Sequence, residues 1–288
     1  MDEALGMGWE GPPFDMEALA SVRGLRVERS YDLADNQDAC VAVRRVLVNG
    51  RKPRVRQRSS VAHEVVHTIF PDYGAELERV GVLWRRAGDE SELERLCQTG
   101  AAELLLPLPA FAPRLTRLGA SLEAAVTLAD IFDASIETTT RRVVEVSGEP
   151  LIMLMVRPCS RVGRFASGED LGADSYAYDP RTPLVVAYAC NNESSAAVEI
   201  TAGTKLPPRS AAERAWKRVS LARHSIVIQC TIDEWTHVEG LGRYSCEAMT
   251  LPKGSMAPCE VICLLRLDKP RLSGTPSEAQ SDHAEQHE

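Results

Sequence analysis

The sequence predicts an α+β protein with two folded units joined by a helical segment, and three observations support this fold class. The chain has 288 residues, more than the roughly 100 to 200 that one domain usually needs. Up to residue 146, apolar residues recur mainly at helical spacing. After Pro150, short apolar runs alternate with turns rich in Gly, Pro and Asn, which is typical of strands.

Helices dominate the first half, and prolines mark two of their ends. Val61, Val65 and Ile69 recur at helical spacing until Pro71, so we expect a mostly buried helix there. Good helix formers fill the next helical stretch, which stops at Pro107. The expected elements are a helix over 15–22, a strand over 25–30, a hairpin over 39–50 supported by a turn at Asn49-Gly50, and helices over 56–70, 90–106 and 121–146.

The second half reads as a separate α+β domain of about 120 residues, a usual domain size. Its apolar runs are of strand length, and one of them, "LIMLMV", is the most apolar run of the chain. The polar end of the chain, residues 271–288, is expected to be disordered. The expected elements are strands over 151–156, 183–190, 224–232, 243–251 and 259–267, and a helix over 211–222.

Composition narrows the function classes. The chain carries 33 Lys and Arg against 41 Asp and Glu, a formal charge of −8, which argues against a generally basic nucleic-acid binder. No apolar run approaches the roughly 20 residues of a membrane span, and the acidic N-terminus does not resemble a secretory signal. Eight cysteines without dense spacing fit reduced thiols. We therefore expect a cytoplasmic protein that does not act at a membrane.

The sharpest motif is His63-Glu64-Val65-Val66-His67. Residues four apart share one face of a helix, so both imidazoles can reach one cation. Glu64, one step around the helix, can contact a water on that cation. The alternative is an ordinary pair of helix histidines, but the chain has only six His and this pair lies on an apolar helix. The motif therefore favours a zinc site for hydrolysis.

A catalytic zinc usually takes a third protein ligand and leaves one position open for water. The next helix offers Glu94 and Glu103, which are nine residues apart, so the helical rotation lets only one of them face the site. Glu94 shares a face with Cys97 and Ala101, whose small side chains would let two helices approach closely. The spacing alone favours Glu94 only modestly.

The phrases "RQRSSVAHEVVHTIF" and "ELERLCQTGAAELLLP" together resemble the ImmA/IrrE family of bacterial metallopeptidases. The resemblance covers about residues 15–146 and departs from the family pattern at Ser59, Val66 and Leu106. It implies that Glu94 is the third ligand and Glu64 the catalytic glutamate. It also implies the following organisation: a zincin-like domain over 1–112, a helix-turn-helix-like segment over 113–150 and a GAF-like sensor domain over 151–270.

The expected chemistry is hydrolysis of a peptide bond at Zn²⁺, although Mn²⁺ accepts the same donors. Glu64 would take the proton of the attacking water and return it to the leaving amine. Tyr73 is a candidate donor to the oxyanion. Cys97 and Cys159 are candidate regulatory thiols, because a thiolate can occupy an open zinc position, but a packing role is the favoured interpretation of both.

Two segments invite a nucleic-acid hypothesis. Residues 44–58 hold seven basic residues and no acid, so they can attract single-stranded nucleic acid, although such charges also protect hairpin edges from strand pairing, the alternative that we favour. Residues 121–146 have the spacing of two helices around a short turn, with Arg141 and Arg142 on the second helix. Three nearby acidic residues oppose phosphate binding, so this segment is expected to support the site or to dock a protein.

The resemblance also implies a substrate. Members of the family cleave a cognate helix-turn-helix repressor of the XRE class and so release genes for stress, DNA-damage or phage-defence responses. The expected activator is single-stranded DNA or a small molecule sensed by the second domain. The alternatives are a non-enzymatic DNA-binding regulator with a structural zinc, and a peptidase that acts on a toxin or antitoxin partner.

Overall fold

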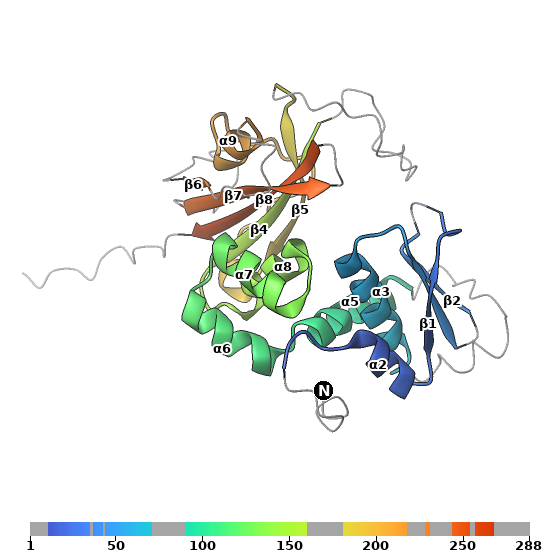
Figure 1. Ribbon diagram of the computed structural model, residues 1–288. Helices are drawn as coiled ribbons and strands as arrows, with labels where there is room; N and C mark the ends of the chain where they lie inside the picture. The colour runs from blue at the N-terminus through green and yellow to red at the C-terminus, as the bar shows by residue number, and fades with distance from the viewer. Residues whose placement is uncertain are drawn as a thin grey trace, which may run out of the picture.

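The computed structural model describes residues 11–34, 37–42, 44–70, 90–159, 181–217, 228–230, 244–253 and 257–267. Figure 1 shows two sheets with helices between them: a small sheet beside α3 and α5, and a larger sheet covered by α7 and α8. The expectation of mixed helix and sheet is confirmed. Among the described residues, no helix combines the length and apolarity needed to cross a bilayer.

The small sheet has the order β1-β3-β2, in which β1 runs parallel to β3 and β2 runs antiparallel to it. The expected hairpin is formed by β2 and β3, but its turn is not at Asn49-Gly50. Arg44, with a φ of 61°, lies between the two strands, and Asn49 ends β3. The bounds are α2 (Met16–Val22), β1 (Arg26–Ser30), β2 (Ala39–Ala42) and β3 (Arg45–Asn49).

Asn49 has a structural role instead of a turn role. Its side chain is fully buried and donates to the backbone oxygens of Ala34 and Gln37 at 3.2 and 2.9 Å. The Asn-Gly signal is normally read as a hairpin turn because both residues tolerate a left-handed backbone. Here the buried amide satisfies carbonyl groups of the preceding loop, and the chain continues into α3.

Helices α3 (Arg54–His67) and α5 (Glu90–Leu105) pack side by side. The helix expected over 56–70 ends three residues earlier, because the N–H groups of Thr68, Ile69 and Phe70 bond three residues back and tighten the last turn. In α3 the buried positions include Val61, Val65 and Val66. The periodic apolar pattern therefore predicted the burial of Val61 and Val65 correctly, but Ile69 follows the end of α3 and is 61% exposed.

Gly100 allows α3 and α5 to approach closely. A Cβ atom at Gly100 would lie 2.7 Å from Cγ1 and 2.9 Å from Cγ2 of Val66. Both distances are shorter than van der Waals contact, so Val66 occupies the space that a side chain at position 100 would need. The backbone of α5 can thus approach the Val66 side chain of α3.

Three helices follow, and serine caps start two of them. Ser121 accepts from the N–H of Ala124 at the start of α7, and Ser135 accepts from that of Thr138 at the start of α8. Asp133, in the left-handed region with a φ of 51°, ends α7. The expected two helices around a short turn are present. Their bounds are α6 (Leu108–Leu118), α7 (Leu122–Phe132) and α8 (Ile136–Val146).

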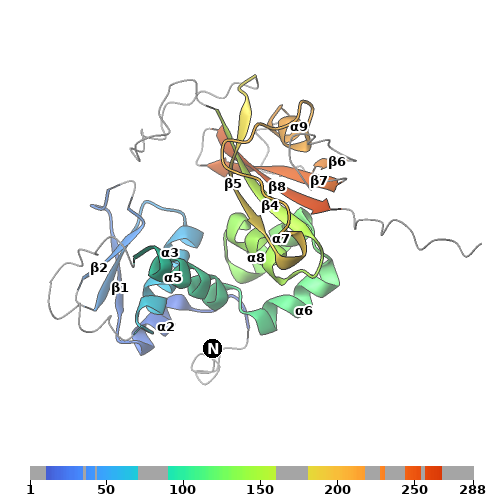
Figure 2. The ribbon, with the colours of Figure 1, turned by 180° about the vertical axis from the view of Figure 1, so that it is seen from behind.

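The large sheet is antiparallel, with the order β5-β4-β8-β7-β6. All five expected strands overlap its strands, and the expected helix over 211–222 corresponds to α9. Figure 2 shows α9 on the opposite side of this sheet from α7 and α8. The bounds are β4 (Leu151–Pro158), β5 (Leu184–Asn191), η1 (Glu193–Ser195), α9 (Ala211–Lys217), β6 (Ile228–Cys230), β7 (Tyr244–Lys253) and β8 (Ala257–Leu267).

Strand β4 is buried on both faces. Leu151, Met153 and Met155 belong to a core that continues through α7 and α8 to α3. Ile152 and Leu154 face the opposite core, beneath α9. Alternate side chains point to opposite faces of a strand, so this continuous apolar run is the sequence of a central strand covered on both sides. The domain boundaries given above stay predictions.

Two arginines tie the helices of the small-sheet side to the α7–α8 pair. Arg58 of α3 donates to the backbone oxygens of Asp133 and Phe14 at 3.0 and 3.1 Å. Arg142 of α8 is 9% exposed, donates to the backbone oxygen of Leu106 at 3.1 Å and pairs with Glu103 of α5. Each guanidinium group therefore replaces the hydrogen bonds to water that it loses on burial with bonds to backbone oxygens and carboxylates, and these bonds hold the helices together.

We expect Gly100→Ala to lower the free energy of unfolding by about 1–3 kcal/mol, because the added methyl group overpacks the contact with Val66. Helix propensity alone would predict the opposite sign, by about 1 kcal/mol. Urea unfolding of the metal-free protein measures the change. Val66→Ala in the same chain should restore most of the loss, and Gly148→Ala, where nothing lies within 4 Å, should be close to neutral. A Gly100→Ala variant as stable as the parent would contradict the close contact.

Candidate metal centre

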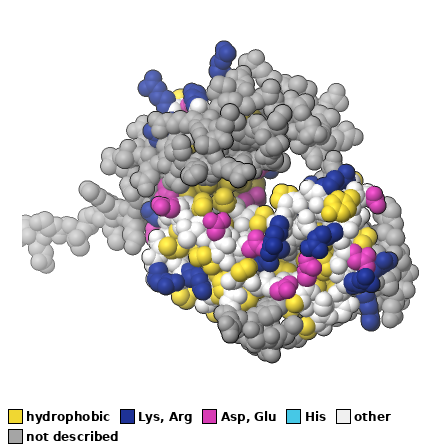
Figure 3. All heavy atoms as spheres, in the orientation of Figure 1, with side chains coloured by type: hydrophobic (Ala, Val, Ile, Leu, Met, Phe, Trp, Pro, Cys, Tyr) yellow, Lys and Arg dark blue, Asp and Glu magenta, His cyan; other side chains and the backbone are white. Residues whose placement is uncertain are grey.

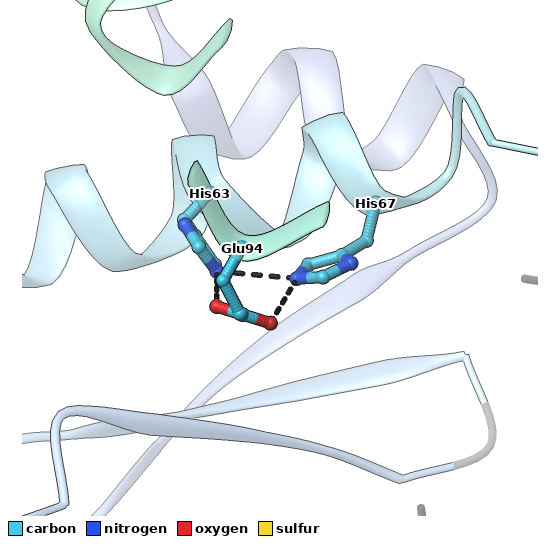
Figure 4. Close-up of side chains that lie close together, drawn as sticks. All are labelled: His63, His67 and Glu94. Carbon is cyan, nitrogen blue, oxygen red and sulfur yellow. Dashed lines mark hydrogen bonds and ion pairs between the residues drawn. The ribbon is translucent and has the colours of Figure 1, made fainter. Parts of the chain in front are cut away.

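His63, His67 and Glu94 meet between α3 and α5, as Figure 4 shows. The Nε2 atom of His63 lies 3.1 Å from Oε2 of Glu94 and 3.1 Å from Nε2 of His67. The Nε2 atom of His67 lies 3.4 Å from Oε1 of Glu94. Three side chains from two helices therefore direct one donor atom each toward a common point.

These separations fit a tetrahedral divalent ion. Zinc binds imidazole nitrogen and carboxylate oxygen at about 2.0–2.2 Å, so two ligands of a tetrahedral shell lie about 3.3–3.6 Å apart. The two imidazole nitrogens are 3.1 Å apart, and each lies 3.1–3.4 Å from a different oxygen of Glu94, which is close to that range. The donor set, two neutral nitrogens and one carboxylate, suits zinc and leaves one position for water.

The two helices supply these groups for local reasons. His63 and His67 are four residues apart, and their rings meet edge to face with centroids 4.8 Å apart. His67 is buried, whereas the side chains of His63 and Glu94 are 20% and 27% exposed. The site is thus closed on the side of the core and reachable from the other side.

Glu103, the rival of Glu94, is directed elsewhere. Its Oε1 atom accepts from the backbone N–H of Leu108 at 2.9 Å, and its Oε2 atom pairs with Arg142. Glu94 and Glu103 point to opposite sides of α5, which is why only one of them was expected in the site. The structure places Glu94 there and uses Glu103 to join α5 to α6 and α8.

An open cleft of about 970 Å³ lies beside the candidate metal centre. Glu64 is 7% exposed and lines this cleft together with His63 and Glu94. A buried carboxylate that lines the same cleft as two candidate ligands is a candidate general base. Tyr73, the candidate oxyanion donor, lies outside the described residues.

One wall of the cleft was not expected from the sequence. It is formed by α8, through Glu137, Thr138, Arg141 and Glu145, opposite residues of β2 and the loop before it. These residues follow the metal motif by 70 positions or more, and no spacing rule relates them to it. The sequence analysis expected this helical segment to support the site or to dock a protein and did not name these residues; the structure shows that they line the cleft.

The α8 wall is linked to the large sheet. Tyr188 of β5 donates to Glu137, and the Arg141 guanidinium lies over the Tyr188 ring, 5.6 Å from its centroid. Burial raises the pKa of Tyr188, and the bond to Glu137 raises it further. Burial also raises the pKa of the Cys190 thiol nearby. Both groups therefore keep their protons at neutral pH, and Tyr188 remains a donor.

The two candidate regulatory cysteines lie in different surroundings. The Sγ atom of Cys97 is 3.4 Å from Nδ1 of His67, on the edge of the ring away from Glu94. Cys97 therefore contacts the ring nitrogen of His67 that does not face Glu94, and its role as a regulatory thiol stays a prediction. Cys159 follows β4, where its backbone N–H donates to Pro183, and it is not among the described residues that line the cleft.

Three acidic side chains offset part of the charge of the basic segment 44–58. Figure 3 shows basic and acidic side chains interspersed on the face in view. Five of its seven basic residues form ion pairs within 4.0 Å: Arg45 with Glu28, Lys52 and Arg56 with Asp38, and Arg54 and Arg58 with Asp133. These pairs reduce the charge available to phosphate groups.

Helix α8, the second helix of the pair, does not present a DNA-reading face. A recognition helix in the major groove needs several exposed side chains along one side. In α8 only Glu145 is exposed, and Arg142 is buried against α5. The helix covers the large sheet and the cleft instead.

Comparisons with known proteins agree with the geometry. The peptidase M78 family model, described as the IrrE N-terminal-like domain, matches residues 22–144. A protein of Deinococcus radiodurans named "Radiation response metalloprotease IrrE" is 29% identical over 128 residues, 44% of this chain and 39% of that protein. Its namesake from Deinococcus deserti is 27% identical over 183 residues, 63% of this chain and 61% of that protein. The chain thus matches less than two thirds of the length of either relative.

A solved structure, a "Mycobacterium tuberculosis transcriptional regulator", superposes with a TM-score of 0.54 and 13% identity, covering 88% of this chain and 69% of that one. At this identity the likeness concerns the fold alone. The resemblance carried by the two motif phrases is confirmed by the family model and by both relatives. Residues 22–144, which include the candidate metal centre, therefore belong to the ImmA/IrrE family of metallopeptidases.

Proposed function

We propose that this chain is a metal-dependent endopeptidase that cleaves one regulatory protein. The observation that carries the proposal is the spacing of His63, His67 and Glu94, which suits a tetrahedral ion at the wall of an open cleft. A structural zinc site usually has four protein ligands, whereas a catalytic site keeps a position for water. Among the described residues, three such ligands cluster here.

Zn²⁺ is the proposed ion, and Mn²⁺ is the alternative that accepts the same nitrogen and oxygen donors. When bound, the ion would polarise the scissile carbonyl and acidify a water. His63 and His67 would hold it from α3, and Glu94 from α5. Glu64 would accept the proton of the attacking water and donate it to the leaving amine, which is why its position at the cleft matters.

The proposed substrate is a helix-turn-helix repressor of the XRE class, whose cleavage would release stress, DNA-damage or phage-defence genes. Support comes from the family and from two relatives that are named radiation response metalloproteases. General digestion would harm the cell that makes such an enzyme, so a single substrate and a controlled activity fit the proposed cytoplasmic location. A toxin or antitoxin partner is the alternative substrate.

The large sheet and its helices are proposed to act as a GAF-like sensor over about residues 151–270, after a zincin-like domain over 1–112 and a helix-turn-helix-like segment over 113–150. A small molecule or single-stranded DNA would be its signal. The contact of Tyr188 with Glu137 supports this proposal, because it connects the sheet directly to a residue that lines the cleft.

The rival function is a DNA-binding regulator with a structural metal. The burial of α8 and the ion pairs of the basic segment argue against it. Incubation of the purified protein with the repressor encoded beside its gene, followed by mass spectrometry, separates the hypotheses. Metal-dependent cleavage at one position supports the proposal. An intact repressor together with tight, salt-sensitive DNA binding would favour the rival.

Glu64→Gln should reduce cleavage at least about 100-fold, because the amide cannot accept the proton of the water. The variant should still bind metal, since Glu64 is not one of the three clustered ligands. Mass spectrometry of repressor fragments measures cleavage, and atomic emission measures bound metal. Parental cleavage by the metal-loaded variant would refute the assigned role.

Glu94→Gln should weaken metal binding by more than the roughly 10- to 100-fold loss typical of an outer-shell partner, because it removes the negative ligand. Glu103→Gln is the matched control on the same helix. It should leave metal affinity unchanged but lower the free energy of unfolding by about 1–3 kcal/mol, because Arg142 loses a charged partner. Competition with a chelator measures affinity. Equal metal affinity of the two variants would reject Glu94 as a ligand.

A further inference from the structure

We propose that Cys97 is a positioning residue that holds the His67 imidazole for metal binding. The inference rests on the proposed metal centre, since the ring must be held toward an ion. It differs from the earlier expectation for this thiol, because Cys97 acts through His67 and does not contact the ion.

The two edges of the His67 ring are occupied by one turn of α5. Its Nε2 atom lies 3.4 Å from Oε1 of Glu94, and its Nδ1 atom lies 3.4 Å from Sγ of Cys97. Glu94 and Cys97 are three residues apart, so they share a face of the helix. The same turn of α5 thus supplies a candidate ligand on one side of the ring and a hydrogen-bond partner on the other.

Coordination through Nε2 fixes the proton of the neutral ring on Nδ1. Metal-binding histidines almost always donate this second N–H to an acceptor, which sets the orientation of the ring. Cys97 is fully buried and His67 is 5% exposed, so this bond lies inside the packed interior, where an unmade hydrogen bond is unfavourable. A thiol sulfur is a weak acceptor, and here it has the required position.

A packing role for Cys97 makes the opposite prediction about substitutions. A buried cysteine can serve as a small hydrophobe, in which case Ala or Val would replace it and Ser would be the poorest choice. A positioning role requires an acceptor, so Ser would retain function and Ala and Val would not. The order of these variants therefore distinguishes the two roles.

The experiment titrates the metal-free full-length protein with Co²⁺ and follows the visible absorption of the bound ion. The series contains the parent, Cys97→Ala, Cys97→Val and Cys97→Ser, with Cys263→Ala as the control at another buried cysteine. Cys97→Ala and Cys97→Val are expected to weaken Co²⁺ binding about 10-fold or more. Cys97→Ser should recover most of that loss, and Cys263→Ala should bind like the parent.

Parental affinity in Cys97→Ala, or an equal loss in Cys97→Ser, would overturn the positioning role while leaving the metal centre intact. A parent that shows no saturable Co²⁺ binding would instead overturn the proposed function. A second measurement needs no substitution: in the Zn²⁺-loaded parent, nitrogen-15 NMR should find a proton on Nδ1 of His67 that is protected from exchange. A bare or rapidly exchanging Nδ1 would also overturn the proposal.

Discussion

Close contact between α3 and α5 is the constraint on which the candidate metal centre depends. One helix supplies His63 and His67 and the other supplies Glu94, so separations of 3.1–3.4 Å require the two backbones to be near each other. Gly100 allows this because Val66 occupies the space of its missing side chain. Functional groups generally need to lie within about 0.5 Å of their productive positions. The packing of α3 against α5 therefore determines whether the three donor side chains can bind one ion.

The rest of the fold stabilises this contact. Arg58 attaches α3 to the end of α7, and Arg142 joins α8 to the last turn of α5. Helix α8 is at once a wall of the cleft and a cover of the large sheet, where Tyr188 contacts Glu137. The described residues that line the cleft all belong to the first half of the chain, and α8 connects this cleft to the large sheet of the second half.

Local spacing predicted much of this arrangement, and tertiary packing explains the remainder. The four-residue spacing of the histidines and the opposite phases of Glu94 and Glu103 follow from helix geometry, so they were readable from the sequence. The position of Cys97 behind His67 depends on how two helices cross, which a single sequence does not specify. The same holds for α8 at the cleft. The turn predicted at Asn49 was wrong because its buried amide donates hydrogen bonds to backbone oxygens of the preceding loop, which the local Asn-Gly signal does not reveal.

Strand β4 has a mechanical implication. Its side chains enter two hydrophobic layers, one continuous with the helices around the metal centre and the other beneath α9. A rearrangement in the layer beneath α9 is expected to displace this strand, because a close-packed interior transmits displacement. Strand β4 is thus expected to transmit displacements between the layer beneath α9 and the helices around the metal centre. Removing the chain after residue 150 would expose to water the apolar side chains of α7 and α8 that pack against the large sheet.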